Sequence, residues 1–256
     1  MVASERGDRE NAIIEFHHAL DRAPQRADLH YLLGQEYFQL NYWQGAVSAY
    51  RRSTELDSGK PLYHAGLGEA LLALHDYEAA TKAFETVAQL DSNFWDINYL
   101  IGYGYRNQLK FEIARKYFER QLSITPGHIE SLANLGFISV EQNRLVEGEK
   151  YLQQVLTAEP DHLTANFDLG RMWSKLGRDD RTIVAFSHVL MVSPDFAAAQ
   201  LQLALCYSRL QKTAEAQAAL AEFKKLEELD KQMRRDRLNL ERAREVQYGN
   251  SPEGKN

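Results

Sequence analysis

The sequence predicts an all-α protein built from repeated pairs of antiparallel helices. YLLGQEY at residues 31–37 returns as YLIGYGY at residues 99–105, an offset of 68 residues. AGLGEAL begins at the midpoint, residue 65, and places Gly68 in register with Gly34 and Gly102. The resulting period of 34 residues continues through six units without an insertion. A fixed period of this length indicates a stack of helical repeats.

Each unit repeats the same columns of residues. With Gly34 counted as position 8, the units cover residues 27–60, 61–94, 95–128, 129–162, 163–196 and 197–230. Position 8 is small in every unit: Gly34, Gly68, Gly102, Gly136, Gly170 and Ala204. Position 24 is large and apolar: Tyr50, Phe84, Phe118, Leu152, Phe186 and Leu220. Positions 4, 7, 8 and 11 share one face of a first helix, and positions 20, 24 and 27 share one face of a second. We therefore expect the small residues to let the two helices approach each other.

Proline and short polar segments separate the expected helices. Pro126, Pro160 and Pro194 follow the second helix of their units, where a proline breaks no helical hydrogen bond. Pro61 opens a first helix, the other position at which helices accept proline. Segments such as LNYW, LHDY and LGRD separate the first helix of a unit from the second.

The two ends of the chain differ from the middle. Residues 9–26 match the second helix of a unit, so an incomplete first repeat is expected there, either continued upstream or capped by another element. Residues 214–246 contain no Gly or Pro, which predicts one long helix that caps the stack, with residues 231–246 as its extension. A coiled-coil dimer is the alternative, although Asp236 interrupts its apolar seam. We expect one solenoid domain over residues 1–246 and a disordered tail at residues 247–256.

Composition excludes several classes of protein. Hydrophobic residues make up 44% of the chain and charged residues 26%, which is ordinary for a globular protein. The net charge of −6 disfavours non-specific binding of nucleic acid. No uninterrupted apolar run is long enough for a membrane span. The polar start, MVASERGDRE, is unlike a secretory signal, so the cytoplasm is the expected location, or the periplasm if a targeting segment lies upstream.

The sequence offers no pattern typical of catalysis or of metal binding. His17 and His18 are adjacent, so they point about 100° apart on a helix and cannot share a metal ion. The single cysteine, Cys206, lies within an expected helix and is interpreted as a small buried hydrophobic residue. Gly102 and Gly104 also lie within a helix, not in a phosphate-binding loop. We expect no enzyme activity, no metal and no cofactor.

The repeat resembles the tetratricopeptide repeat. The resemblance rests on the 34-residue period and on its Leu-Gly, Tyr, Ala, Phe and Pro columns, and it covers residues 9 to about 228. Position 4 departs from the family, because it holds His30, His64, Asn98, Leu132, Asn166 and Gln200 and never Trp. The resemblance implies a right-handed superhelix whose first helices line a concave, peptide-binding face. The family's clamp for a C-terminal carboxylate is not matched, since no unit has Lys at position 5.

The resemblance also indicates which residues line that face. Positions 2, 5, 9 and 12 form its stripe, and Asn134 adds a polar group at position 6. The expected peptide-binding residues are Tyr31, Glu69, Asp96, Tyr99, Tyr103, Arg106, Glu130, Asn134, Phe137, Phe167 and Arg171. The early units are acidic along this stripe, and the later ones become basic. The alternative is that many of these side chains pack between neighbouring helices.

The expected function is therefore non-catalytic. The chain would act as a scaffold or adaptor that binds an extended polypeptide segment in an aromatic-lined groove. The alternative is a structural subunit of a larger complex that uses its ends or its convex face. Ile13, Ile14 and Phe16 lie on a helix without its usual partner, which predicts weak self-association through the N-terminal end.

Overall fold

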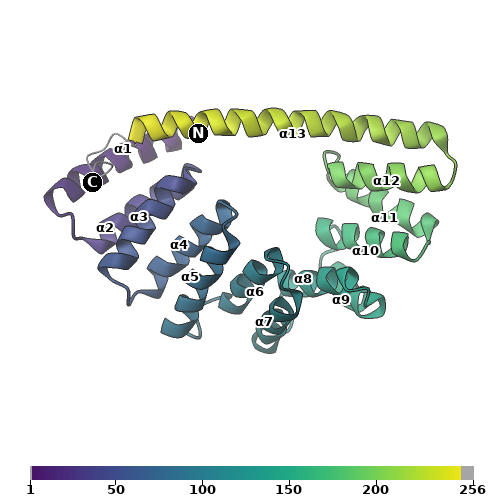
Figure 1. Ribbon diagram of the computed structural model, residues 1–256, viewed down its shortest axis with the longest axis horizontal. Coiled ribbons are helices and arrows are strands. Elements are labelled where there is room, and N and C mark those ends of the chain that lie inside the picture. Colours follow the sequence, from purple (N-terminus) through teal and green to yellow (C-terminus); the bar gives the residue numbers. More distant parts are fainter. Residues whose placement is uncertain (1, 249–256) are drawn as a thin grey trace. The chain divides into compact units, whose positions relative to one another are not determined.

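The computed structural model describes the backbone of residues 2–248 and the side chains of residues 7–240, 242–244 and 246. This part of the chain contains thirteen α-helices and no strand (Figure 1). It divides into two compact units, residues 1–126 and residues 127–256. Most of the tail predicted at residues 247–256 lies outside the described residues, and residues 247 and 248 continue the last helix instead.

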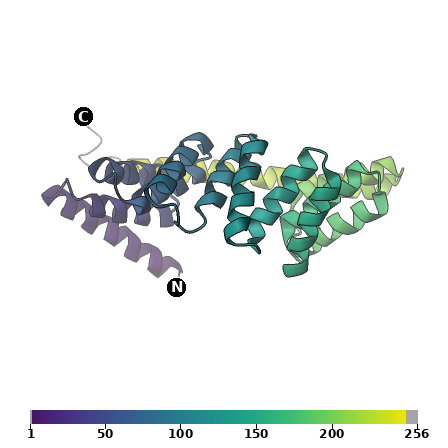
Figure 2. The same ribbon diagram turned by 90° about the horizontal axis from the view of Figure 1, so that it is seen from below.

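The first unit contains seven helices that pack in chain order. They are α1 (Val2–Arg22), α2 (Ala27–Gln39), α3 (Trp43–Leu56), α4 (Pro61–Ala73), α5 (Tyr77–Leu90), α6 (Ile97–Asn107) and α7 (Phe111–Ile124). The pairs α2–α3, α4–α5 and α6–α7 make the most extensive contacts. Each pair also contacts the next, through α3–α4 and α5–α6, and α1 packs on α2 (Figures 1 and 2).

The second unit repeats this arrangement. Its helices are α8 (Ile129–Glu141), α9 (Leu145–Ala158), α10 (Leu163–Lys175), α11 (Asp179–Val192), α12 (Ala197–Arg209) and α13 (Thr213–Tyr248). The pairs are α8–α9, α10–α11 and α12–α13, and neighbouring pairs meet through α9–α10 and α11–α12. The fold is therefore an all-α solenoid of antiparallel helix pairs. None of the described helices combines the length and the apolar character that a membrane span requires.

One first helix starts later than its unit. The first helices of five units begin at the first residue of the unit, at Ala27, Pro61, Ile129, Leu163 and Ala197. The third begins at Ile97, two residues after the expected start at Trp95. Asp96 is the reason, because its backbone is left-handed, with φ 50° and ψ 18°. Asp96 therefore precedes the helix on which the sequence pattern places it.

The small residues at position 8 explain how closely the paired helices approach. A Cβ atom added there would meet the side chain at position 24 of the same unit. Its distance to the nearest carbon would be 2.7 Å at Gly34, 2.6 Å at Gly68, 2.9 Å at Gly102, 2.6 Å at Gly136 and 2.6 Å at Gly170. Each is shorter than normal van der Waals contact, so a larger residue would push the helices apart.

Every first helix ends in the same turn. Position 15 of each unit is left-handed, with φ between 58° and 66°: Asn41, His75, Leu109, Asn143, Gly177 and Gln211. The next backbone N–H then donates back to the carbonyl of position 11, as from Tyr42 to Tyr37 at 2.8 Å. This pattern is the Schellman motif, which satisfies a carbonyl at the helix end while the chain reverses. The turn makes each helix pair antiparallel.

Candidate functional site

A cluster of tyrosines lies across the first three helices that follow α1. The ring of Tyr31 on α2 lies 5.5 Å from that of Tyr50 on α3 and 5.1 Å from that of Tyr63 on α4. Gly66 permits this, because a Cβ on that residue would lie 2.9 Å from Tyr50 Cε1. Tyr50 is buried, whereas Tyr31 and Tyr63 are only half-buried. Part of each of these two rings is therefore exposed to another molecule.

Glu69 places a negative charge beside the tyrosine cluster. It lies on α4 and is half-buried, and burial raises the pKa of its carboxyl group. The charge of Glu69 in turn adds to burial in raising the pKa of Tyr31, so the two groups are close in space. Among the described residues, Glu69 makes no hydrogen bond or ion pair, whereas Glu36 receives a hydrogen bond from Arg9 at 2.9 Å. The charge of Glu69 is therefore not neutralised within the first unit.

A second aromatic group lies on α6. The rings of Tyr99 and Tyr103 are 6.1 Å apart, and the guanidinium carbon of Arg106 lies 5.9 Å from the Tyr103 ring centre. All three side chains are half-buried, as the prediction of a binding stripe requires. Asp96 has a different environment, since its carboxylate accepts a hydrogen bond at 2.9 Å from the buried Gln121 of α7. It holds the start of α6 against α7 through this bond.

Three basic residues are expected in the second unit, and two of them, Arg171 and Arg209, are neutralised by acidic partners, whereas Lys175 donates to the backbone carbonyl of Val140 at 2.7 Å. The guanidinium of Arg171 donates to Asp168 at 3.0 Å and also pairs with Glu141. It lies 5.7 Å from the ring centre of Phe137, so all three contacts fix its position. Arg209 donates likewise to Asp179 at 2.7 Å. The expectation that this part of the stripe is basic is therefore not supported by its ion pairs.

Three further predicted residues differ in how much surface they offer. Phe167 packs against the core rings of Phe186 and Phe196, with centres 5.4 and 5.0 Å away. Asn134 is buried, and its amide donates to the carbonyl of Glu130 at 2.7 Å. The side chain of Glu130 is exposed. Packing between helices therefore accounts for Asn134, whereas Phe167 is half-buried and Glu130 stays exposed with its carboxylate 3.6 Å from His128 Nδ1.

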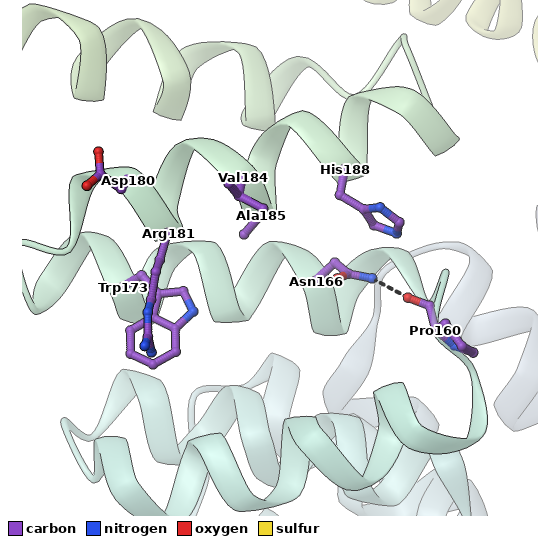
Figure 3. A pocket seen from close by; sticks show the side chains of 8 residues that line it. All are labelled: Pro160, Asn166, Trp173, Asp180, Arg181, Val184, Ala185 and His188. Atoms are coloured by element: carbon purple, nitrogen blue, oxygen red, sulfur yellow. Dashed lines mark hydrogen bonds between the residues drawn. The ribbon is translucent and has the colours of Figure 1, made fainter.

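The second unit also contains a pocket that the sequence pattern did not predict. It has a volume of about 450 Å³ and lies on α10 and α11 (Figure 3). Its lining is Pro160, Asn166, Trp173, Asp180, Arg181, Val184, Ala185 and His188. The guanidinium of Arg181 stacks 4.6 Å from the centre of the Trp173 ring, and Asn166 donates to the carbonyl of Pro160 at 2.9 Å. The pocket is therefore mainly apolar, with charged groups at its edge.

A comparison of repeats explains why the pocket is open. In the third repeat, Tyr117 at position 23 stacks on Tyr105 at position 11, with ring centres 5.8 Å apart. In the fifth repeat, Ala185 and Trp173 occupy these positions, so no second ring covers the tryptophan. Val184 lies at position 22 of its repeat and is 70% exposed, whereas three other repeats have a lysine at this position. An apolar residue in that column was the signal in the sequence that could have identified the pocket.

The groups that could carry chemistry are few. Cys206 is fully buried, and its Sγ lies 3.4 Å from a carboxylate oxygen of Asp179. Burial and this contact raise the pKa of its thiol to about 11, so it stays protonated at neutral pH and is a poor nucleophile. Within the described residues, no three histidine, cysteine, aspartate or glutamate side chains gather as metal ligands would.

Several solved structures share this arrangement of helices. A tetratricopeptide repeat protein from Parabacteroides merdae matches with a TM-score of 0.75 and 16% identity over 88% of each chain. A chain of the APC/C hetero-tetramer Cut9–Hcn1 matches with a TM-score of 0.71 and 20% identity, over 88% of this chain and 45% of that one. YrrB, a tetratricopeptide repeat protein with an unusual peptide-binding site, gives 0.57 and 18% over 72% of this chain and 95% of that one. At these identities the likeness shows the fold alone.

Sequence comparison assigns the family. No curated protein matches the chain. A family model described as the protein kinase G tetratricopeptide repeat matches residues 58–247, and one described as the tetratricopeptide repeat matches residues 1–61. The first of these matches alone spans more than half of the 256 residues. Together with the 34-residue columns and the stacked helix pairs, these matches show that the chain belongs to the tetratricopeptide repeat family.

Proposed function

We propose that this protein is a non-catalytic scaffold that binds an extended segment of another polypeptide. The fold suggests protein–protein interaction, and YrrB, which shares it, has a peptide-binding site. In this chain the binding surface would be the first-helix stripe of the first unit, on α2, α4 and α6. The half-buried rings of Tyr31, Tyr99 and Tyr103 support this choice, because tyrosine offers large contact area at low entropic cost.

The observation that carries the proposal is the uncompensated charge of Glu69 beside Tyr31. A lysine or arginine side chain fits such a place, since its charge pairs with the carboxylate while its stem lies on the rings. A cation over an aromatic face contributes about 0.5–2 kcal/mol, and more when the site is desolvated. The preferred ligand is thus an extended segment that carries a basic residue next to apolar ones.

Arg171 and Arg209 of the second unit add no demand for acidic residues in the ligand. Arg171 and Arg209 are already paired with carboxylates of the same unit, so an acidic side chain would have to displace them. The exposed Glu130 is negatively charged, so the second unit also offers a basic ligand residue a carboxylate of its own. We therefore assign selectivity for basic segments and none for acidic ones.

The test is a peptide library selected against the intact protein. Enriched peptides should be rich in Lys and Arg, and the Glu69→Gln variant should bind them about tenfold more weakly, which corresponds to 1.4 kcal/mol. Glu78→Gln is the matched control, because Glu78 is exposed on the second helix α5 and pairs with Lys82. A Tyr99→Ala/Tyr103→Ala variant tests the rings. Peptides that bind the parent, Glu69→Gln and the tyrosine variant equally would disprove this site.

A second function is favoured by the outer part of α13. Leu229 and Met233 lie one turn apart and are each more than half exposed. An exposed apolar stripe on a long helix is typical of assembly with another subunit. In this alternative the chain is a permanent subunit of a complex, as Cut9 and Hcn1 are of theirs. A constitutive oligomer that Leu229→Glu/Met233→Glu dissociates would support it over the scaffold.

A further inference from the structure

The end of the second unit carries an apolar hollow that no described residue covers. It lies between α12 and the first turns of α13 and has a volume of about 300 Å³. Leu201, Leu205 and Leu220 supply its apolar surface, and Leu205 is 48% exposed. Ser208, Gln211 and Gln217 supply its rim, which is polar but uncharged. Both helices belong to the second unit, so the hollow is formed within one compact unit.

Comparison with the earlier repeats shows that this surface is normally a packing interface. Leu220 occupies position 24, which is at most 4% exposed in the five preceding repeats: Tyr50, Phe84, Phe118, Leu152 and Phe186. Leu220 itself is 36% exposed. Its backbone environment matches that of the others, since α12 and α13 pair as the other helices do. What differs is the element that covers the face of the pair.

Within each unit, the covering element is the first helix of the next repeat. In the first unit, α4 covers Tyr50 and presents Gly66, whose absent Cβ leaves room for the ring. Between the second and third repeats, Gly104 of α6 packs against the side chain of Thr81 on α5. In the second unit, α12 places Ala199 in the core cluster that contains Phe186 of α11. A helix with a small residue at the point of contact is thus the element that this surface accepts.

Among the residues that the structure describes, no such helix follows the sixth repeat. α13 continues as a single helix to Tyr248 and does not turn back over α12. The residues from 231 to 240 on this extension are all exposed. Among the described residues, the hollow beside Leu205 and Leu220 therefore remains open.

We propose that this hollow binds an amphipathic α-helix of a partner protein, which stacks as the first helix of a seventh repeat would. The partner helix would place Gly or Ala against Leu220 and apolar residues against Leu201 and Leu205. Its flanks would be polar and uncharged, to match Ser208, Gln211 and Gln217. This docking surface is separate from the stripe around Glu69, so the two sites can bind different segments.

The chain contains a probe for this surface, because α4 covers the equivalent face of the first repeat. A fluorescent synthetic peptide of residues 60–76, cross-linked between solvent-facing positions to hold it helical, is titrated into the intact protein. We expect an increase in anisotropy that Leu205→Glu weakens at least tenfold. Leu176→Glu is the matched control, since Leu176 lies in the same unit and is also 48% exposed. A second peptide with Gly66→Leu should not bind.

Three outcomes would overturn the proposal. The first is no binding of the α4 peptide, and the second is equal binding by the parent and Leu205→Glu. The third is a parent dimer in light scattering that Leu205→Glu dissociates, because a second copy of the chain would then be the occupant. The variant Glu69→Gln should leave binding of the α4 peptide unchanged. A negative result for the hollow can therefore be distinguished from a negative result for the peptide-binding stripe around Glu69.

Discussion

Single glycines determine how the helices of each repeat pack. A glycine within a helix costs about 1 kcal/mol relative to alanine, yet five repeats place one at position 8. The close approach of the position 24 side chain accounts for this, since a Cβ would stand less than 3 Å from it. The sequence alone predicted this contact, because both columns are visible without coordinates.

Replacing Gly102 with leucine should destabilise the third repeat. A side chain there would collide with Phe118, whose Cε1 would lie 2.9 Å from the new Cβ. Overpacking of this kind lowers the free energy of unfolding by about 1–3 kcal/mol. Denaturant unfolding measures the change, and Gly7→Ala is the control, because a Cβ at Gly7 meets nothing within 4 Å. Hydrogen exchange should show the loss centred on α6 and α7, and a uniform loss along the chain would contradict repeat-by-repeat packing.

At the left-handed turn of position 15, a substitution by glycine should stabilise the protein, in contrast to the loss of a glycine at position 8. Leu109 has φ 61° and is 74% exposed, so it contributes strain without much packing. Leu109→Gly should raise the free energy of unfolding by about 0.5–1 kcal/mol, because glycine adopts this conformation without a Cβ clash. Gly177→Ala should lower it by a similar amount, since Gly177 has φ 66° and open space around it. Thermal unfolding that moves in the same direction for both substitutions would refute this account.

Glu69 should show a conflict between stability and binding. Burial raises its folded-state pKa, so the folded protein holds a proton there more tightly than the unfolded chain does. Stability therefore falls as pH rises from the unfolded pKa through the folded one, and the penalty is complete above it. We expect Glu69→Gln to be more stable than the parent at neutral pH, with the difference vanishing near pH 4. Unfolding curves at several pH values test this, and a variant less stable at neutral pH would show that the carboxylate has a stabilising partner.

At the scale of helices, the 34-residue columns predict the first residue of five of the six first helices. The prediction is wrong for α6, where the backbone before the helix is left-handed. Asp96 delays the start of α6, and although aspartate adopts the left-handed conformation more often than most residues, the columns do not mark it as the point of delay. The turns at Leu109 and Gln211 are not signalled by residue type at all, because glycine, asparagine, aspartate and histidine are the residues enriched in this conformation. The register of neighbouring helices imposes these conformations, and that register is a property of the folded stack.

The long helix α13 should contribute to stability through its first turns. Ala216 and Ala219 are buried against α12, and Ala219 belongs to the core cluster of Phe186 and Leu203. Deleting residues 214–256 should expose Leu203 and lower both the melting temperature and the solubility. The control is Leu229→Gln/Met233→Gln, which changes only exposed side chains and should leave the melting temperature unchanged. A deletion variant as stable and soluble as the parent would remove the stabilising role of α13.

At the scale of the whole molecule, the sequence identifies the rings of the proposed binding stripe but not the electrostatic environment of its charged residues. The tyrosines of the stripe are visible in the columns, but the partners of its charges are not. Arg171 is basic in the sequence, but in the fold its charge is neutralised by Asp168, one turn earlier on α10, and by Glu141 at the end of α8. Glu69 shows the reverse, since only the fold reveals that a half-buried carboxylate has been left unpaired.

Binding of basic segments should depend on salt through the rate of association. The net charge of −6 attracts a cationic peptide over a distance that salt shortens, to about 10 Å at 0.1 M ionic strength. A tenfold rise in salt, from 0.05 to 0.5 M, shortens the Debye length about threefold. We expect the association rate of a selected peptide to fall severalfold over this range, with a smaller change in its dissociation rate. Glu69→Gln and Glu78→Gln reduce the net charge equally, so stopped-flow measurements on both separate local attraction from the overall field. If Glu69 is the receiving group, its variant alone should also dissociate faster. Equal dissociation rates for the two variants would assign the attraction to the overall charge and remove Glu69 from the site.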